Sequence, residues 1–187
     1  MNSWTALVSI VALLVIGGLV WTYLRQRRSA GLRDRFGPEY DRAIRETGSR
    51  RQAEAELKHR EKRIQKLAIR PLAPGERSHY GEQWKTQQAR FVDDPGGAVR
   101  EADHLVEEVM KLRGYPVAEF DQRVADISVD HPQVVENYRA AHEVAMRNQR
   151  GRAATEDLRN AMIYYRNLFE ELLEDRPAVA VREQRAG

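Results

Sequence analysis

The sequence predicts an all-α protein with an N-terminal transmembrane helix, a long charged stalk helix and a C-terminal bundle of four to five helices. Charged residues make up 32% of the 187-residue chain and aromatic residues only 7%, a balance that disfavours strands, which prefer β-branched and aromatic side chains. Apolar residues recur at helical spacing in the C-terminal half. We expect four segments: an anchor over 1–24, a basic segment and stalk over 25–70, the bundle over 71–175 and a flexible tail over 176–187.

The N-terminal segment contains a run of 21 residues without a charge, from Trp4 to Leu24. A helix of that length spans about 30 Å, the thickness of the hydrocarbon core of a bilayer. Aromatic residues lie near both ends, where amphipathic rings favour the headgroup level. A cleavable signal peptide is the alternative, but it requires a basic start and a small-residue cleavage site. Because neither is present, an uncleaved anchor is the better interpretation.

The orientation of this anchor follows from the arginines that flank it. Arg25, Arg27 and Arg28 directly follow the apolar run, and no basic side chain precedes it. The positive-inside rule therefore predicts an external N-terminus and a cytoplasmic C-terminal domain. The same three arginines are candidates for contact with anionic lipid headgroups.

The charge beyond the anchor divides into two parts. Residues 25–70 carry 15 basic and 7 acidic side chains, a net charge of +8, whereas residues 71–187 carry 16 basic and 21 acidic side chains, a net charge of −5. A basic segment next to a bilayer is attracted to anionic lipid, which leaves a lipid-surface or envelope-stress sensor as one alternative function. We expect no nucleic-acid partner, because the acidic part repels phosphates and the basic part lacks an aromatic stacking platform.

The basic segment is predicted to continue as one stalk helix from Pro38 to about Leu67. Proline is favoured at the first helical position, and apolar residues are too sparse for a sustained coiled coil. Oppositely charged residues four positions apart support an exposed helix, and Gly48 marks a possible bend. These pairs are Asp41 with Arg45, Glu46 with Arg50, Glu54 with Lys58, and Glu56 with Arg60.

The C-terminal bundle is predicted to begin after the prolines at positions 71 and 74, which cannot lie inside a helix. Tyr80, Trp84 and Phe91 share one face of a helix over about 75–92. If the stalk does not cover these rings, they form a patch for a partner. The proline and glycine signals predict four further helices: one from Pro95 to Gly114, a short one after Pro116, one from Pro132 to Gly151, and one that Thr155 caps and that runs through Asp175.

Two Glu-x-x-His pairs suggest metal as an alternative. Glu76 with His79, and Glu101 with His104, show the spacing that di-iron carboxylate bundles use on two different helices. Such bundles also need an inward glutamate from each of two further helices, and we assign none. The chain has no cysteine, which excludes thiolate metal sites and cysteine nucleophiles. Recognised hydrolase and nucleotide-binding motifs are absent as well, so we expect no cofactor and no catalysis.

Several segments, such as RFGPEYDRA, QARFVDDP and TEDLRNAMIYYRNLFEELL, resemble an uncharacterised family of small bacterial single-pass membrane proteins with a C-terminal helical domain. The resemblance covers nearly all of residues 33–173 and implies a bacterial membrane protein, with no activity and no catalytic residues to transfer. The sequence thus predicts a membrane-tethered interaction or scaffold module with an unknown protein partner. The segments that carry the resemblance are RFGPEYDRA, EAELKHREKRIQKL, IRPL, QARFVDDP, EADHLVEEVM, RGYPV, ISVDHPQVVENYRAAH and TEDLRNAMIYYRNLFEELL.

Overall fold

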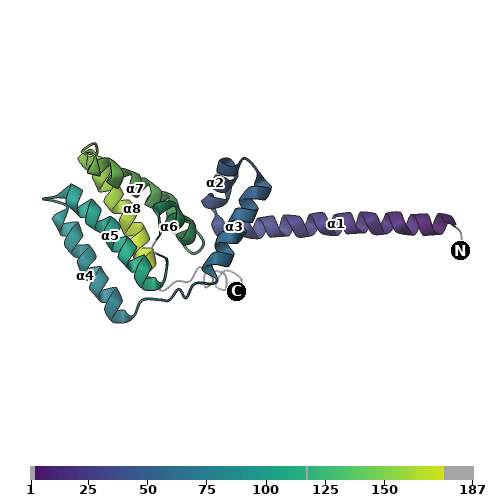
Figure 1. The fold of residues 1–187 in the computed structure, drawn as a ribbon, viewed down its shortest axis with the longest axis horizontal. Coiled ribbons are helices and arrows are strands. Elements are labelled where there is room, and N and C mark those ends of the chain that lie inside the picture. Colours follow the sequence, from purple (N-terminus) through teal and green to yellow (C-terminus); the bar gives the residue numbers. More distant parts are fainter. Residues whose placement is uncertain (1–2, 117, 175–187) are drawn as a thin grey trace, which may run out of the picture. The chain divides into compact units, whose positions relative to one another are not determined.

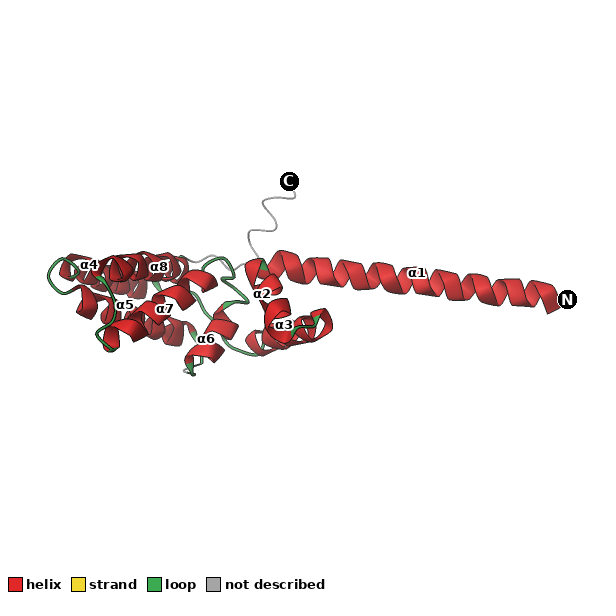
Figure 2. Cartoon of the chain, turned by 90° about the horizontal axis from the view of Figure 1, so that it is seen from above, coloured by secondary structure: helices red, strands yellow, loops and turns green. Residues whose placement is uncertain are grey.

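The protein is all-α, as the sequence predicts. The computed structural model describes residues 3–116 and 118–174, and these ranges contain helices and loops but no strand (Figure 2). The chain forms two compact units, Met1–Leu57 and Lys58–Gly187. The tail expected over 176–187 lies outside the described residues.

The first unit contains one long helix, α1 (Ser3–Phe36), which Figure 1 shows without interruption. With 34 residues it is about 50 Å long. It continues through the arginines that follow the apolar run and ends at Phe36, and the N–H of the next residue, Gly37, donates to the Arg33 carbonyl at 2.9 Å. No helix within the described part of the chain is long and apolar enough to cross a membrane. Most side chains of residues 4–24 are outside that part.

The single stalk helix that we expected over 38–67 is wrong. The structure has two helices there, α2 (Pro38–Thr47) and α3 (Arg50–Ile64). They are separated at Gly48, which adopts a left-handed conformation (φ +65°) and donates its N–H to the Ile44 carbonyl at 2.9 Å. Glycine adopts this conformation at little cost, so the chain turns here instead of bending.

The second unit is the expected helical bundle, made of five helices among the described residues of 74–174. Helix α8 packs against both α5 and α7, and α4 packs against α5 (Figure 1). The core consists of small and aliphatic residues of α5 and α8 together with buried tyrosines of α7 and α8. The helices are α4 (Pro74–Arg90), α5 (Pro95–Arg113), α6 (Phe120–Ile127), α7 (Val135–Gln149) and α8 (Thr155–Leu173).

Helix α5 begins and ends where local signals predict. The Asp94 carboxylate accepts a hydrogen bond from the Gly97 N–H at 2.8 Å, which is an N-cap. Gly114 ends the helix at φ +101°, and a Cβ atom at this position would lie 2.7 Å from the Ala68 carbonyl oxygen. The Arg70 N–H donates to the Arg113 carbonyl at 2.8 Å. The chain before α4 is therefore held closely against the end of α5.

The starts of the last two helices differ from the prediction. Thr155 is not the cap of α8: the N-cap is Ala154, whose N–H donates to the Asp157 carboxylate at 3.3 Å. The acidic side chain takes over the capping role because it reaches back from the third helical position. Helix α7 starts at Val135 instead of Pro132, because a turn occupies residues 132–134.

Candidate functional site

Glu76, one of the four candidate metal ligands, is already held by hydrogen bonds from other residues of the protein. Its carboxylate accepts two hydrogen bonds from the Arg70 guanidinium, each 2.8 Å, and one from the Ala73 N–H at 2.8 Å. The Arg70 contacts, followed by the backbone N–H, lower the pKa of Glu76 to about 2. This side chain therefore fixes the start of α4. His79, one turn later, is exposed and lies 2.8 Å from the Gln83 amide nitrogen.

The other candidate pair lies on α5. The His104 ring is exposed, with Nε2 3.4 Å from Glu108 Oε1, and no described contact joins it to Glu101. Among the residues that the structure describes, no three His, Asp or Glu side chains gather to hold a metal ion. The two Glu-x-x-His pairs are thus not brought together.

The expected aromatic patch divides between core and surface. Trp84 is buried and stacks on Phe169 of α8, with ring centroids 4.7 Å apart, so its ring is not available to a partner. The bundle itself covers this residue, because α8 packs on α4. Tyr80 and Phe91 remain half-exposed on either side. Of the expected patch, these two rings are the accessible part.

A cavity of about 550 Å³ opens beside Tyr80. Its size lies within the range of small-ligand sites, about 300–1,000 Å³. We call it the Tyr80 pocket. One part of its wall is apolar and another is charged. The wall is made by residues of α4, α5 and α6 together with Pro116. The lining residues are Tyr80, His104, Glu107, Glu108, Met110, Lys111, Leu112, Pro116 and Arg123.

An ion pair lies at the inner side of this pocket. Arg123 Nη2 is 2.5 Å from Glu107 Oε1, and the arginine side chain is only 12% exposed. Its other terminal nitrogen donates to the Ala118 carbonyl at 3.3 Å. Burial opposes the charge of Arg123, but Tyr138 and Glu107 outweigh it and raise its pKa. Arg123 therefore keeps its charge, and the short contact holds both side chains in position.

A group of polar side chains lies inside the bundle behind Arg123. We call Asp103, Tyr138, His142 and Tyr165 the Asp103 cluster. His142 Nδ1 is 3.6 Å from Asp103 Oδ2, and the imidazole stacks on Phe120 with centroids 3.7 Å apart. The two tyrosine rings are fully buried, with centroids 6.2 Å apart. Three helices thus contribute polar groups to one part of the core.

The polar atoms of this cluster are poorly satisfied. Within the described residues, Asp103 Oδ1 and the hydroxyls of Tyr138 and Tyr165 are buried and make no hydrogen bond of normal geometry. Burial raises the pKa of both tyrosines, and the Asp103 carboxylate adds to the rise at Tyr165. Both phenols are therefore neutral. An unsatisfied buried polar group costs about 1–3 kcal/mol, so the approach of Asp103 to Tyr165 and of Arg123 to Tyr138 bears on the stability of this core.

His131, in the loop before α7, is buried. Its Nδ1 lies 2.9 Å from Glu171 Oε2 on α8. The neighbouring Asp130 is not part of this contact between His131 and Glu171. Its carboxylate accepts a hydrogen bond from the Tyr115 hydroxyl at 2.9 Å. These two contacts tie the loop before α7 to α8 and to the end of α5.

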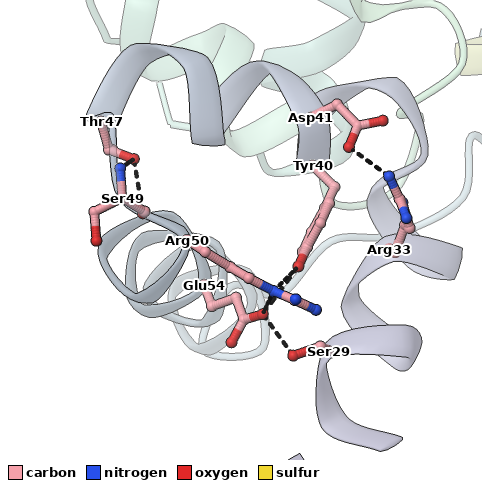
Figure 3. Close-up of polar contacts among 8 residues, drawn as sticks. All are labelled: Ser29, Arg33, Tyr40, Asp41, Thr47, Ser49, Arg50 and Glu54. Carbon is pink, nitrogen blue, oxygen red and sulfur yellow. Dashed lines mark hydrogen bonds and ion pairs between the residues drawn. The ribbon is translucent and has the colours of Figure 1, made fainter. Parts of the chain in front are cut away.

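The first unit has a polar cluster of its own, drawn in Figure 3. We call Ser29, Tyr40, Arg50 and Glu54 the Glu54 cluster, with contributions from α1, α2 and α3. Glu54 Oε1 accepts hydrogen bonds from Ser29 Oγ at 2.6 Å, the Tyr40 hydroxyl at 2.9 Å and Arg50 Nε at 3.1 Å. Burial opposes the carboxylate charge, but the three donors outweigh it and lower the pKa of Glu54. An ion pair between Arg33 and Asp41, 2.9 Å long, lies beside the cluster.

The candidate lipid contacts precede this cluster on α1. Arg27 is exposed, whereas the side chains of Arg25 and Arg28 lie outside the described residues. Ser29 follows them directly and is buried. The boundary between the exposed part of α1 and the part packed in the first unit therefore falls close to these arginines.

Sequence reasoning missed the Asp103 cluster. Asp103 and Glu107, and likewise Tyr138 and His142, are four residues apart and so share a helix face, which is the one local signal that points to it. Comparison with known proteins adds no assignment: no family model matches the chain, and neither a curated protein nor a solved structure is detectably similar to it.

Proposed function

We propose that this protein is a membrane-tethered helical module that binds a protein partner through its C-terminal bundle. The tether is α1 over residues 4–24, in the inner membrane of a bacterium, with the N-terminus outside and the bundle in the cytoplasm. The bacterial source is the one that the family resemblance implies.

The observation that carries the tether is the exposure of large apolar side chains along α1. Trp4, Leu13 and Tyr23 are 75%, 69% and 62% exposed, and Ile16, Leu19 and Val20 are exposed as well. Soluble proteins rarely expose large contiguous apolar patches to water. Lipid would cover it, because the chain from Trp4 to Leu24 has no charge and the length of a bilayer core.

The charge of the flanking residues supports the orientation. Arg25, Arg27 and Arg28 would lie at the cytoplasmic headgroups, where each basic side chain contributes about 1 kcal/mol of attraction to anionic lipid. Cytoplasmic flanks of membrane helices are enriched in Arg and Lys.

Partner binding by the bundle rests on its surface. Residues 71–187 have a net charge of −5, and the Tyr80 pocket adds a concave site with apolar and charged walls. Charge of one sign around a cleft attracts a partner of the opposite sign.

Topology is the experiment that tests the tether. A cytoplasm-active and a periplasm-active reporter are fused in turn after Gly187, and the protein is fractionated with and without residues 1–24. We expect activity from the cytoplasmic reporter only, and membrane recovery that the deletion abolishes. Activity from the exported reporter only would overturn the orientation, and recovery of the full chain in the soluble fraction would overturn the tether.

A further inference from the structure

We propose that the Tyr80 pocket binds a side chain with an apolar stem and a cationic head, an Arg or a Lys on an exposed basic segment of the protein partner. This inference rests on the proposed function and names the chemistry of the partner that the bundle recognises. The carrying observation is the juxtaposition, in one cavity, of an aromatic ring, aliphatic side chains and two neighbouring carboxylates.

The apolar wall suits the stem of such a side chain. The Tyr80 ring and the side chains of Met110, Leu112 and Pro116 face the cavity. Lys and Arg bury three or four methylene groups against surfaces of this kind while the charge stays at the polar end. A purely inorganic cation would leave this wall unused.

The acidic wall suits the head. Glu107 and Glu108 are consecutive on α5, and both line the cavity. Glu107 is held by Arg123, so it meets a ligand without first having to be ordered, which reduces the cost of binding. Glu108 has a weaker neighbour, the exposed His104 ring at 3.4 Å, and is the carboxylate that a new cation can pair with.

Tyr80 adds a second attraction for a cation. Burial raises the pKa of its phenol, and the carboxylates of Glu108 and Glu76 raise it further. The ring therefore lines the pocket close to two negative charges. A guanidinium or ammonium over an aromatic face is attracted by the negative face of the ring, and the attraction is stronger when water is excluded.

The basic residues of the pocket do not favour an anion instead. Arg123 is already paired with Glu107, so an anion would have to separate a half-buried ion pair to reach it. Lys111 is exposed at the rim, where its charge is screened. The negative charge of the whole bundle also repels an anionic ligand.

The test uses the full chain in nanodiscs of zwitterionic lipid, with empty nanodiscs as the blank. The probe is a capped pentapeptide in which glycines flank and separate two arginines, and its control has glutamines in place of the arginines. Calorimetry measures the Kd for the parent protein, for Glu108→Gln and for Glu143→Gln. Glu143→Gln is the matched control. Glu143 is exposed on α7, and the substitution removes the same charge outside the pocket.

We expect the arginine peptide to bind and the glutamine peptide not to bind. Glu108→Gln should weaken binding about fivefold or more, and Glu143→Gln by less than twofold. Tyr80→Leu should weaken it as well, with thermal unfolding used to confirm that each variant is folded. Equal effects of the two glutamate variants, or no binding at all, would overturn the pocket assignment.

A second arm separates the two sources of such a cation. Spermidine has a methylene stem and ammonium groups but no peptide backbone. Weaker binding than the peptide supports a protein partner, and tighter binding overturns it in favour of a free polyamine. Because the topology experiment reads membrane insertion and this one reads binding, the failure of one is distinguishable from the failure of the other.

Discussion

Ser29 on α1 donates a hydrogen bond of 2.6 Å from its hydroxyl to Glu54 Oε1 on α3, 25 positions later in the chain. The same oxygen accepts from Tyr40 on α2 (Figure 3). One carboxylate thus joins the three helices of the first unit. Because Glu54 is only 16% exposed, water cannot readily replace these contacts.

Replacing this carboxylate should destabilise the first unit. Glu54→Ala removes three hydrogen bonds and leaves the Tyr40 hydroxyl without its acceptor, so we expect a loss of about 2 kcal/mol. Chemical denaturation of the full chain, followed by a probe in the first unit, measures it. Gln52→Ala, an exposed position on the same helix, should change stability by less than about 0.5 kcal/mol. A similar loss for both variants would contradict this role of Glu54.

The same carboxylate gives the first unit a pH dependence. The pKa of Glu54 is lower in the folded protein than its ordinary value, so the folded state favours the ionised form. Its contribution is fully present above the unfolded pKa of about 4.3 and is lost as the pH falls through the lower folded value. Unfolding measured from pH 7 to pH 3 should show this loss in the parent and a smaller one in Glu54→Gln. Parallel curves would contradict it.

Two glycines of the bundle should respond oppositely to alanine. Gly114→Ala forces a side chain into φ +101° and against the Ala68 carbonyl, and we expect a loss of at least about 1 kcal/mol. Gly81 lies inside α4 with open space around it, so Gly81→Ala should stabilise by about 0.5–1 kcal/mol through helix propensity. Thermal unfolding of the two variants measures both signs, and a loss in Gly81→Ala would show a packing role that the geometry does not give it.

Two buried tyrosines also form a matched pair. The Tyr115 hydroxyl donates to Asp130 at 2.9 Å, so Tyr115→Phe should cost about 1–2 kcal/mol. The Tyr165 hydroxyl is buried without a well-formed hydrogen bond, and Tyr165→Phe should be neutral or stabilising. Denaturant midpoints decide between them. A large loss at Tyr165 would mean that its hydroxyl has a strong partner within the Asp103 cluster.

Local signals predict some elements of the fold well and others badly. Helix α5 could be placed from Pro95 and Gly114 alone, because proline at the first position and glycine just past the end are determined by the backbone of a single helix. The turn at Gly48 could not be predicted in this way, because a glycine in a charged helical segment is compatible both with a continuous helix and with a turn. The hydrogen bond between Tyr40 and Glu54, on opposite sides of this turn, decides between the two.

The candidate sites show the same division. Arg70 and Glu76 are six residues apart, and their contact holds the start of a helix. From the sequence, a glutamate in this role cannot be distinguished from a metal ligand. Asp103 and Tyr165 approach each other only because α5 packs on α8. The Tyr80 pocket likewise needs α4, α5 and α6 in place, and no spacing along one helix reveals it.

Because α1 is one uninterrupted helix, the rotation of its N-terminal end about the helix axis is fixed relative to the rest of the first unit. An α-helix turns by about 100° for each residue, so the azimuth of Ser29 depends on the number of residues before it. One residue inserted between Tyr23 and Ser29 would rotate the N-terminal end relative to Glu54 by that angle, without bending the helix. The number of residues in α1, and not only its composition, therefore determines which side chains of its N-terminal end lie on the same side of the helix as Ser29 and the Glu54 cluster.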